Sequence, residues 1–137
     1  MGFETCIHDG YVGTVKWGNE GKQIGILTHI DVVPPGEGWT YPPFEGTIEN
    51  GRLYGRGSLD DKGPMAASLF AMKAIKESGL PVKNHVCHII GTDEESGFMR
   101  CLKNYLEEAS WPWGGFSPDG NFQLSSCGKK AGSLGSM

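Results

Sequence analysis

Two patterns of apolar and polar residues alternate along this chain of 137 residues. Short apolar or alternating runs are typical of strands, and apolar residues that recur every three or four positions are typical of helices with one buried face. An Asn-Gly pair between two short runs is typical of a two-residue hairpin turn. On these grounds we expect strands at Tyr11–Trp17, Gln23–Ile30 and His85–Gly91, a hairpin at Thr47–Tyr54, and helices at Pro64–Ser78 and Gly97–Ala109.

Strands that alternate with helices predict an α/β fold, in which a mixed β-sheet is flanked by helices. The first predicted helix is well delimited, because Met65 and Met72 lie on one face and Gly79 follows its last residue. The final segment, residues 123–137, is rich in Ser, Gly and Lys and shows neither pattern, so we expect it to be disordered. The chain therefore divides into a domain over residues 1–122 and a tail over residues 123–137.

Charge and composition exclude several classes of function. The formal net charge is -4, and no basic patch is present that could bind nucleic acid. No apolar run reaches the roughly 18 residues that a membrane-spanning helix needs. The first residues, MGFETCIHDG, have neither the basic nor the apolar region of a signal peptide. The cysteines are widely spaced and form no CxxC pair, which favours reduced thiols in a cytoplasmic protein. They are Cys6, Cys87, Cys101 and Cys127.

A polar pair ends the strand predicted at Gln23–Ile30. His29 and Asp31 are two positions apart, so their side chains point to the same side if the chain stays extended. This arrangement suits a metal-binding histidine whose second ring nitrogen is held by a carboxylate. A surface pair beside the turn at Pro34 is the alternative, and the pair alone favours that alternative.

Further acidic residues stand where other predicted elements end. Asp60 and Asp61 precede the first predicted helix, where one aspartate could cap the free backbone N–H groups but two leave a spare carboxylate. Asp93, Glu94 and Glu95 follow the strand predicted at His85–Gly91, and Asp119 lies in a loop after a proline. Each has an ordinary alternative, namely a solvated turn near a helix N-terminus or an Asx-turn. Carboxylates gathered in one cleft would repel one another, however, so together they indicate a bound cation.

Four motifs carry a resemblance to a known family. "HIDVVPPGEGW", "GRGSLDDKGP", "GTDEES" and "FSPD", in this order and spacing, resemble the M20 family of dinuclear zinc peptidases. The likeness is greatest to its bacterial dipeptidase branch, the PepV-like Xaa-His dipeptidases, and it runs from about Met1 to Phe122. The resemblance implies part of an M20 catalytic domain without the lid domain, acting on dipeptides or short peptides.

The resemblance also implies a role for each residue of the site. Asp60 would bridge two zinc ions, Glu94 would be the general base, and Asp31 would orient His29. A cis peptide bond is expected between Asp60 and Asp61. Such a site activates a water molecule for hydrolysis, and a mixed set of His and carboxylate ligands also accepts Co²⁺ or Mn²⁺. The implied metal ligands are His29, Asp60, Glu95 and Asp119, and the implied catalytic residues are Glu94 and Asp31.

Several family features are missing from this sequence. The family's second zinc has a further histidine ligand late in the chain, but no histidine follows His88 here. The final residues, QLSSCGKKAGSLGSM, do not continue as family members do, so we expect a truncated or frame-shifted product with little activity of its own. A non-catalytic metal-binding fragment and an M20 amidohydrolase acting on N-acyl amino acids remain alternatives. The sequence specifies no oligomeric state.

Overall fold

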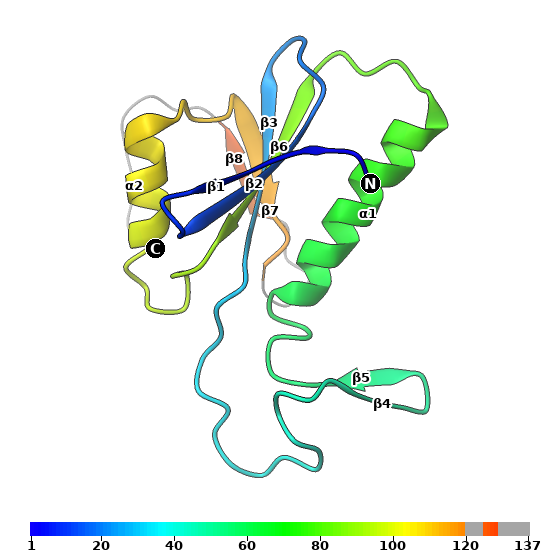
Figure 1. The fold of residues 1–137 in the computed structure, drawn as a ribbon, viewed down its shortest axis with the longest axis vertical. Coiled ribbons are helices and arrows are strands. Elements are labelled where there is room, and N and C mark those ends of the chain that lie inside the picture. Colours follow the sequence, from blue (N-terminus) through cyan, green and yellow to red (C-terminus); the bar gives the residue numbers. More distant parts are fainter. Residues whose placement is uncertain (120–124, 129–137) are drawn as a thin grey trace.

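The computed structural model describes residues 1–119 and 125–128 of the chain (Figure 1). It contains all the helices and strands expected from the sequence, with ends that agree to within three residues. The strands are β1 (Glu4–His8), β2 (Val12–Trp17), β3 (Gln23–His29), β4 (Thr47–Glu49), β5 (Arg52–Tyr54), β6 (His85–Gly91), β7 (Gly114–Ser117) and β8 (Ser125–Gly128). The helices are α1 (Lys62–Ser78) and α2 (Arg100–Glu108).

The main sheet has the strand order β1-β2-β6-β3-β7-β8. Strand β3 runs parallel to both of its neighbours, β6 and β7, whereas the other pairs in this sheet are antiparallel. The expected mixed sheet is therefore confirmed. Strands β4 and β5 form a separate hairpin that does not join it.

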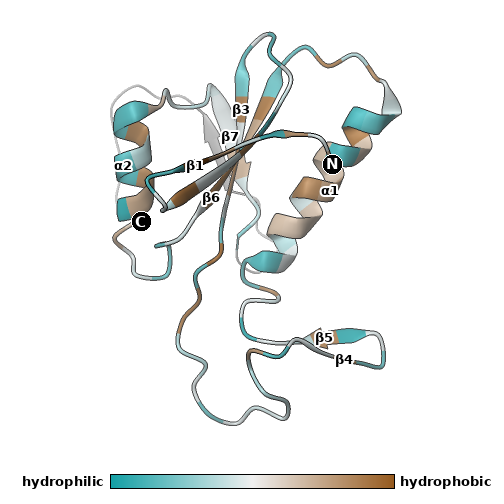
Figure 2. Cartoon of the chain, viewed as in Figure 1, coloured by the Kyte–Doolittle hydropathy of each residue, from teal (hydrophilic) through white to brown (hydrophobic). Residues whose placement is uncertain are grey.

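The two helices cover opposite faces of the sheet (Figure 1). Helix α1 packs against β3 and helix α2 packs against β2. Both helices combine hydrophobic with hydrophilic residues (Figure 2), as expected of helices with one face on a sheet. Pro64 lies in the first turn of α1, where its missing N–H leaves no intrahelical hydrogen bond unmade. The expected α/β architecture with flanking helices is thus confirmed.

The buried core lies mainly between the sheet and α2. Its buried members come from β2, β6 and α2, and Tyr105 contributes the largest side chain. On the α1 side, Met72 is buried together with a polar pair in which His88 Nε2 lies 2.8 Å from Thr28 Oγ1. Burial lowers the pKa of His88 to about 4, so this histidine is neutral at pH 7. Neither helix in the described part of the chain has the length and hydropathy needed to cross a bilayer.

Strands β1, β7 and β8 were not expected from the sequence. Strand β1 is exposed at most positions, so its residues show no apolar pattern, and its backbone pairs with β2. Strand β7 begins with two glycines and shows no apolar run. A Cβ atom at Gly115 would lie 2.3 Å from the carbonyl oxygen of Gly25, so the close approach of β7 to β3 requires glycine there.

The tail was expected to have no structure, but Ser125–Gly128 forms β8 and pairs antiparallel with β7. These residues are small and polar, so the backbone of β7 rather than any apolar pattern accounts for the strand. The expectation was therefore wrong for these residues. The rest of residues 123–137 lies outside the described part of the chain.

A long connection links β3 to α1. It runs from Ile30 to Asp61, carries the β4–β5 hairpin, and extends beyond the end of the sheet (Figure 1). The connection therefore begins directly after His29 and returns beside the same end of β3, at the start of α1.

Candidate metal centre

The site lies at the carboxyl ends of three neighbouring parallel strands. Strand β3 ends at His29, and it lies between β6 and β7. The segments that follow β6 and β7 carry Glu94 with Glu95 and Asp119, so these carboxylates reach the same edge of the sheet. Open α/β sheets collect ligands at such an edge. Asp60 arrives from the other direction, directly before α1.

The distances show how closely these side chains converge on His29. Its Nε2 atom lies 3.0 Å from Asp60 Oδ1, 3.7 Å from Asp119 Oδ1 and 3.9 Å from Glu94 Oε2. The potential ligand atoms of His29, Asp60 and Glu95 all lie within 4.8 Å of one another, and so do those of His29, Asp61 and Asp119. The structure therefore brings Asp60, Glu94, Glu95 and Asp119 together around His29. Asp93 does not join them, because its Oδ2 atom accepts hydrogen bonds from the backbone N–H and Nε of Arg100 at 3.1 Å.

The other nitrogen of His29 fixes the orientation of the ring. Nδ1 donates a hydrogen bond to the backbone carbonyl of Asp31 at 3.1 Å, and Asp31 Oδ1 lies 3.4 Å away. The sequence suggested only the carboxylate of Asp31 for this role, whereas the carbonyl makes the shorter contact. Because Nδ1 carries this proton, Nε2 of the neutral ring is the atom that can bind a metal.

The carboxylate of Asp31 makes a second connection across the site. Its Oδ2 atom accepts a hydrogen bond from the backbone N–H of Glu95 at 3.0 Å. Asp31 thus links the segment after β3 to the segment after β6. Both segments carry candidate ligands, so Asp31 helps to fix their spacing.

Asp61 belongs to the site in a way that the sequence did not reveal. It is fully buried, and its Oδ2 atom accepts a hydrogen bond from the backbone N–H of His29 at 3.1 Å. It precedes α1 but makes no side-chain cap hydrogen bond, so N-capping does not explain it. The only sequence signal was a second carboxylate beside Asp60. The peptide bond between Asp60 and Asp61 is cis, as expected.

The crowding of carboxylates changes the acidity of the site. Burial raises the pKa of Asp61 to about 6, and the charges of Asp119 and Asp60 act in the same direction. Burial also raises the pKa of Glu94, as do the nearby charges of Asp119 and Glu95. For His29, burial alone would lower the pKa, but the hydrogen bond to Asp31 and the surrounding carboxylates raise it. The site therefore attracts positive charge.

These side chains fit a divalent cation. In the metal-free chain, a proton on His29 Nε2 would form a hydrogen bond to the Asp60 carboxylate. A metal cation could replace that proton and bind further carboxylates as well. Among the described residues, two groups of three side chains around His29 have potential ligand atoms within 4.8 Å of one another. Carboxylate oxygens and one imidazole nitrogen form the mixed ligand set of Zn²⁺, Mn²⁺ and Co²⁺ sites.

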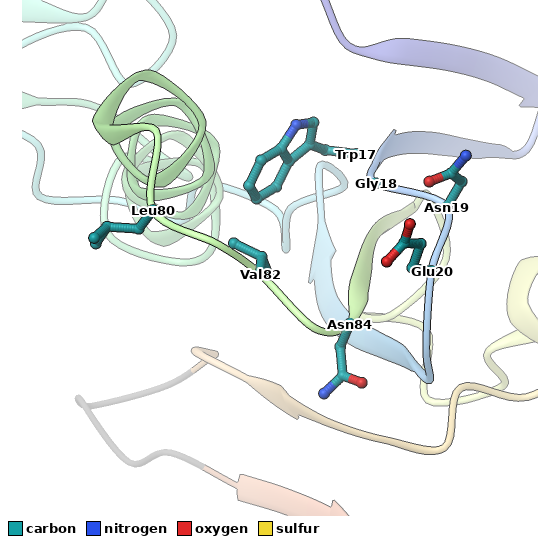
Figure 3. Close-up of a pocket in the computed structure, with 7 residues that line it drawn as sticks. All are labelled: Trp17, Gly18, Asn19, Glu20, Leu80, Val82 and Asn84. Carbon is teal, nitrogen blue, oxygen red and sulfur yellow. The ribbon is translucent and has the colours of Figure 1, made fainter.

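Two depressions lie away from this centre. One of about 260 Å³ is lined by residues that include Trp17 and Val82 (Figure 3), at the amino ends of β3 and β6 and therefore at the opposite edge of the sheet from His29. The other, of about 370 Å³, lies within the connection after β3 and is lined by residues that include Trp39 and Arg56. In the part of the chain that the structure describes, only the cluster around His29 groups three potential metal ligands.

Comparison with known families identifies the fold. Residues 25–133 match the family described as peptidase family M20/M25/M40. The chain belongs to this family. The matched residues include the whole of the candidate metal centre, so the resemblance of the four motifs to M20 peptidases is confirmed.

Relatives within the M20 family include bacterial proteins named as dipeptidases. The chain is 48% identical over 123 residues to "Putative dipeptidase YtjP" of Bacillus subtilis (strain 168), which covers 90% of the chain and 26% of that protein. It is 42% identical over 124 residues to "Beta-Ala-Xaa dipeptidase" of Lactobacillus delbrueckii subsp. lactis, with the same coverage of 90% and 26%. The chain thus spans about a quarter of the length of these relatives.

Solved structures of M20 proteins share the fold. The metallo-carboxypeptidase Sso-CP2 from Sulfolobus solfataricus matches 79% of the chain and 26% of its own, with a TM-score of 0.66 and 30% identity. Human carnosine dipeptidase 1 matches 71% of the chain and 21% of its own, with a TM-score of 0.60 and 31% identity. The fold and the family therefore agree.

Proposed function

We propose that this chain carries the metal-binding part of an M20 dipeptidase that hydrolyses dipeptides or short peptides. The observation that carries the proposal is the convergence of His29, Asp60, Glu94, Glu95 and Asp119 at the carboxyl ends of β3, β6 and β7. The relatives named as dipeptidases support the same substrate class. PepV-like specificity for Xaa-His or β-alanyl dipeptides is the finer form of the proposal.

The proposed ligands divide between two cations. His29, Asp60 and Asp119 would hold the first, since Asp60 and Asp119 are within 3.7 Å of His29 Nε2. Asp60 would be shared, because the two oxygens of one carboxylate can link cations roughly 3.5–4 Å apart. Glu95 would hold the second. Zinc is the proposed metal, and the ligand set also suits Co²⁺ or Mn²⁺.

A bound Zn²⁺ supplies a Lewis acid that polarises the substrate carbonyl and makes water more acidic. The protein's own groups do the rest. Glu94 accepts a proton from the attacking water and passes it to the departing amine. Its raised pKa suits this exchange, because burial makes its carboxylate a stronger base than an exposed glutamate. Asp31 holds His29 in the tautomer that presents Nε2.

A non-catalytic metal-binding fragment is a second candidate that one observation favours. Among the described residues, Glu95 and a share of Asp60 are the proposed ligands of the second cation, and no histidine follows His88 in the sequence. Zinc in catalytic sites normally has three protein ligands, so this position would be weak. We therefore expect one tightly held cation and slow turnover from the isolated chain.

Metal content and hydrolysis, measured together on the purified chain, test the proposal. The assay would compare β-alanyl-histidine, other dipeptides and an N-acyl amino acid after loading with Zn²⁺, Co²⁺ or Mn²⁺. Metal binding with dipeptide hydrolysis supports the dipeptidase, and metal binding without turnover supports the fragment. Preference for the N-acyl amino acid would indicate an amidohydrolase. Absence of any metal binding would contradict the site itself.

A further inference from the structure

Three consecutive residues before and at the start of α1 all contact the end of β3. Asp60 Oδ1 lies 3.0 Å from His29 Nε2. Asp61 Oδ2 accepts the backbone N–H of His29 at 3.1 Å, and Lys62 Nζ donates to the backbone carbonyl of Ile30 at 2.6 Å. The Asp61 carboxylate therefore holds the peptide N–H of His29, and the Lys62 ammonium holds the peptide carbonyl of the next residue, Ile30.

The placement of Asp61 is costly unless it has a specific role. Its side chain is fully buried, and it makes no cap hydrogen bond to α1. Among the described residues its Oδ1 atom has no hydrogen-bond partner. Burying a partly satisfied carboxylate costs free energy, and an apolar residue of similar size would avoid that cost. A carboxylate here can hold the His29 backbone through the hydrogen bond, and it also lies close enough to His29 and Asp119 to bind a cation. The experiments below distinguish these two roles.

Lys62 also lies at a position where a positive charge is unfavourable. Lys62 is the first residue of α1, and the first turn holds no acidic residue. Negative side chains are favoured at a helix N-terminus and positive ones are not, because of the helix dipole. The hydrogen bond from Lys62 to Ile30 offsets this disadvantage, since bonds from a charged donor are about twice as strong as neutral ones.

Gly57 leaves the space through which Lys62 reaches Ile30. A Cβ atom at Gly57 would lie 2.7 Å from Lys62 Nζ and 2.7 Å from Val32 Cγ1. Either contact is too short for a real side chain, so a larger residue would displace the Lys62 ammonium or the Val32 side chain. Gly57 also has a φ of 82°, which favours glycine there in any case.

We propose that Asp61 and Lys62 are positioning residues for the metal centre and do not bind the cation themselves. By fixing the backbone on both sides of His29, they keep His29 Nε2 and Asp60 Oδ1 at the spacing that one cation can bridge. The cation belongs to the proposed function, and this inference therefore rests on that proposal. The two hydrogen bonds can nevertheless be tested in the metal-free chain.

The first experiment measures amide hydrogen exchange by NMR in the metal-free chain. Asp61→Ala should speed exchange at the His29 amide, which is bonded to Asp61, by about 10-fold or more. The Ile30 amide is bonded to Gly91 instead, and its exchange should change much less. Asp61→Asn keeps an acceptor oxygen and should preserve most of the protection at His29. Unchanged exchange at His29 in Asp61→Ala would overturn the proposed contact whatever the metal does.

The second experiment measures Zn²⁺ and Co²⁺ affinity by titration. Residues that orient metal ligands without contacting the metal typically contribute about 10- to 100-fold in metal affinity. We expect a loss of that size in Asp61→Ala and a smaller loss, about 3- to 10-fold, in Lys62→Met. Asp61→Asn should keep the greater part of the affinity and the same visible absorption of Co²⁺. Lys73→Met is the matched control, because Lys73 lies on α1 and, among the described residues, pairs with Glu77 alone.

The outcomes separate this inference from the proposed function. If the unmodified chain binds metal and the Lys62→Met and Asp61→Ala variants bind it equally well, the positioning role is wrong and the metal centre stands. If Asp61→Asn loses as much affinity as Asp61→Ala and alters the Co²⁺ absorption, Asp61 is a direct ligand and the inference is again wrong. If the unmodified chain binds no metal, the proposed function fails first, and the positioning role fails with it.

Discussion

Glu94 lies beside the proposed metal ligands rather than among the closest of them. Its Oε2 atom is 3.9 Å from His29 Nε2, whereas Asp60 reaches the same nitrogen at 3.0 Å. Burial keeps its pKa above the ordinary value for a glutamate, which favours a group that takes and returns a proton. Because Glu94 is proposed as the general base and not as a ligand, its substitution should leave the proposed ligands in place.

Glu94→Gln should separate catalysis from metal binding. We expect peptide hydrolysis by the metal-loaded chain to fall about 100- to 10,000-fold, because general-base catalysis contributes that much. The bound metal, measured by elemental analysis, should not change. Glu107→Gln on the exposed side of α2 serves as the control and should leave both quantities intact. A loss of metal in Glu94→Gln would show that Glu94 is a ligand.

Three strands position most of this site, and each of β3, β6 and β7 delivers its residues from the carboxyl end, whereas Asp60 comes from the segment before α1. The sequence predicted β3 and β6 because both are apolar runs, and it therefore predicted where His29 and Glu94 would lie. It could not predict β7, because Gly114 and Gly115 carry no apolar signal, and the close approach to Gly25 is what requires glycine at position 115. The position of Asp119 consequently followed from the family resemblance alone.

Gly115→Ala should weaken both the fold and the metal centre. Its Cβ atom would meet the backbone of Gly25, which cannot move aside like a flexible side chain. We expect a loss of about 1–3 kcal/mol in the free energy of unfolding, measured with denaturant. Metal affinity should fall too, since Asp119 follows β7. Gly13→Ala in β2 is the control, because its nearest neighbour would be at an ordinary 3.8 Å.

Strand β6 also carries a buried histidine that should make stability depend on pH. The pKa of His88 is about 4 in the folded chain, against an ordinary value of 6.5. Between those values the unfolded chain binds a proton that the folded chain does not. The contribution of His88 to the free energy of unfolding is therefore fully present above pH 6.5 and is lost as the pH drops towards 4. The contribution is on the order of 3 kcal/mol.

Urea unfolding of the metal-free chain between pH 7 and pH 4 measures this effect. His88→Gln should show a shallower loss of stability over that range, even if it is less stable at pH 7. His85→Gln in the same strand is the control, because that ring is only partly buried and makes its contact with the backbone of Glu20. Parallel pH profiles for the unmodified chain and His88→Gln would contradict the assignment.

At the scale of the whole molecule, the metal centre joins segments that are distant in the sequence. His29, Asp60, Glu95 and Asp119 come from separate connections of the sheet, and in the metal-free chain their carboxylates repel one another. A cation that binds only the folded arrangement should therefore stabilise the entire domain. The metal would act on folding as well as on chemistry.

Zinc should raise the stability of the chain in proportion to its binding. At a free concentration of 100 times the dissociation constant, the free energy of unfolding should increase by about 2.7 kcal/mol, because the ligand binds the folded state alone. Thermal melts with and without Zn²⁺ would measure the gain, and EDTA should reverse it. His29→Ala should show no such gain. An equal gain in that variant would place the bound zinc elsewhere.

The sequence indicated the overall architecture and most of the site, but not the contacts that hold the site together. Periodic apolar positions and strand-end acids are local signals, and they located His29, Asp60 and Glu94. The bond from the His29 amide to Asp61 joins residues 32 positions apart, and no pattern encodes a side chain whose partner is a distant backbone group. Edge strands such as β1 were missed for a related reason, since backbone pairing stabilises them.

The connection between β3 and α1 begins and ends at the metal centre, with His29 and Asp60 31 positions apart. Two hydrogen bonds hold the ends of this connection together, and we call this part its neck. Lys62 donates to the carbonyl of Ile30, and Arg56 donates to the carbonyl of Pro35. Closing a loop costs entropy that grows only with the logarithm of its length, about 0.6 kcal/mol for each doubling. Once the neck is held, residues inserted near Gly36 or Gly38 would add little to that cost. The outer part of this loop is therefore free to vary in length, and such changes would leave the metal centre at the end of β3 in place.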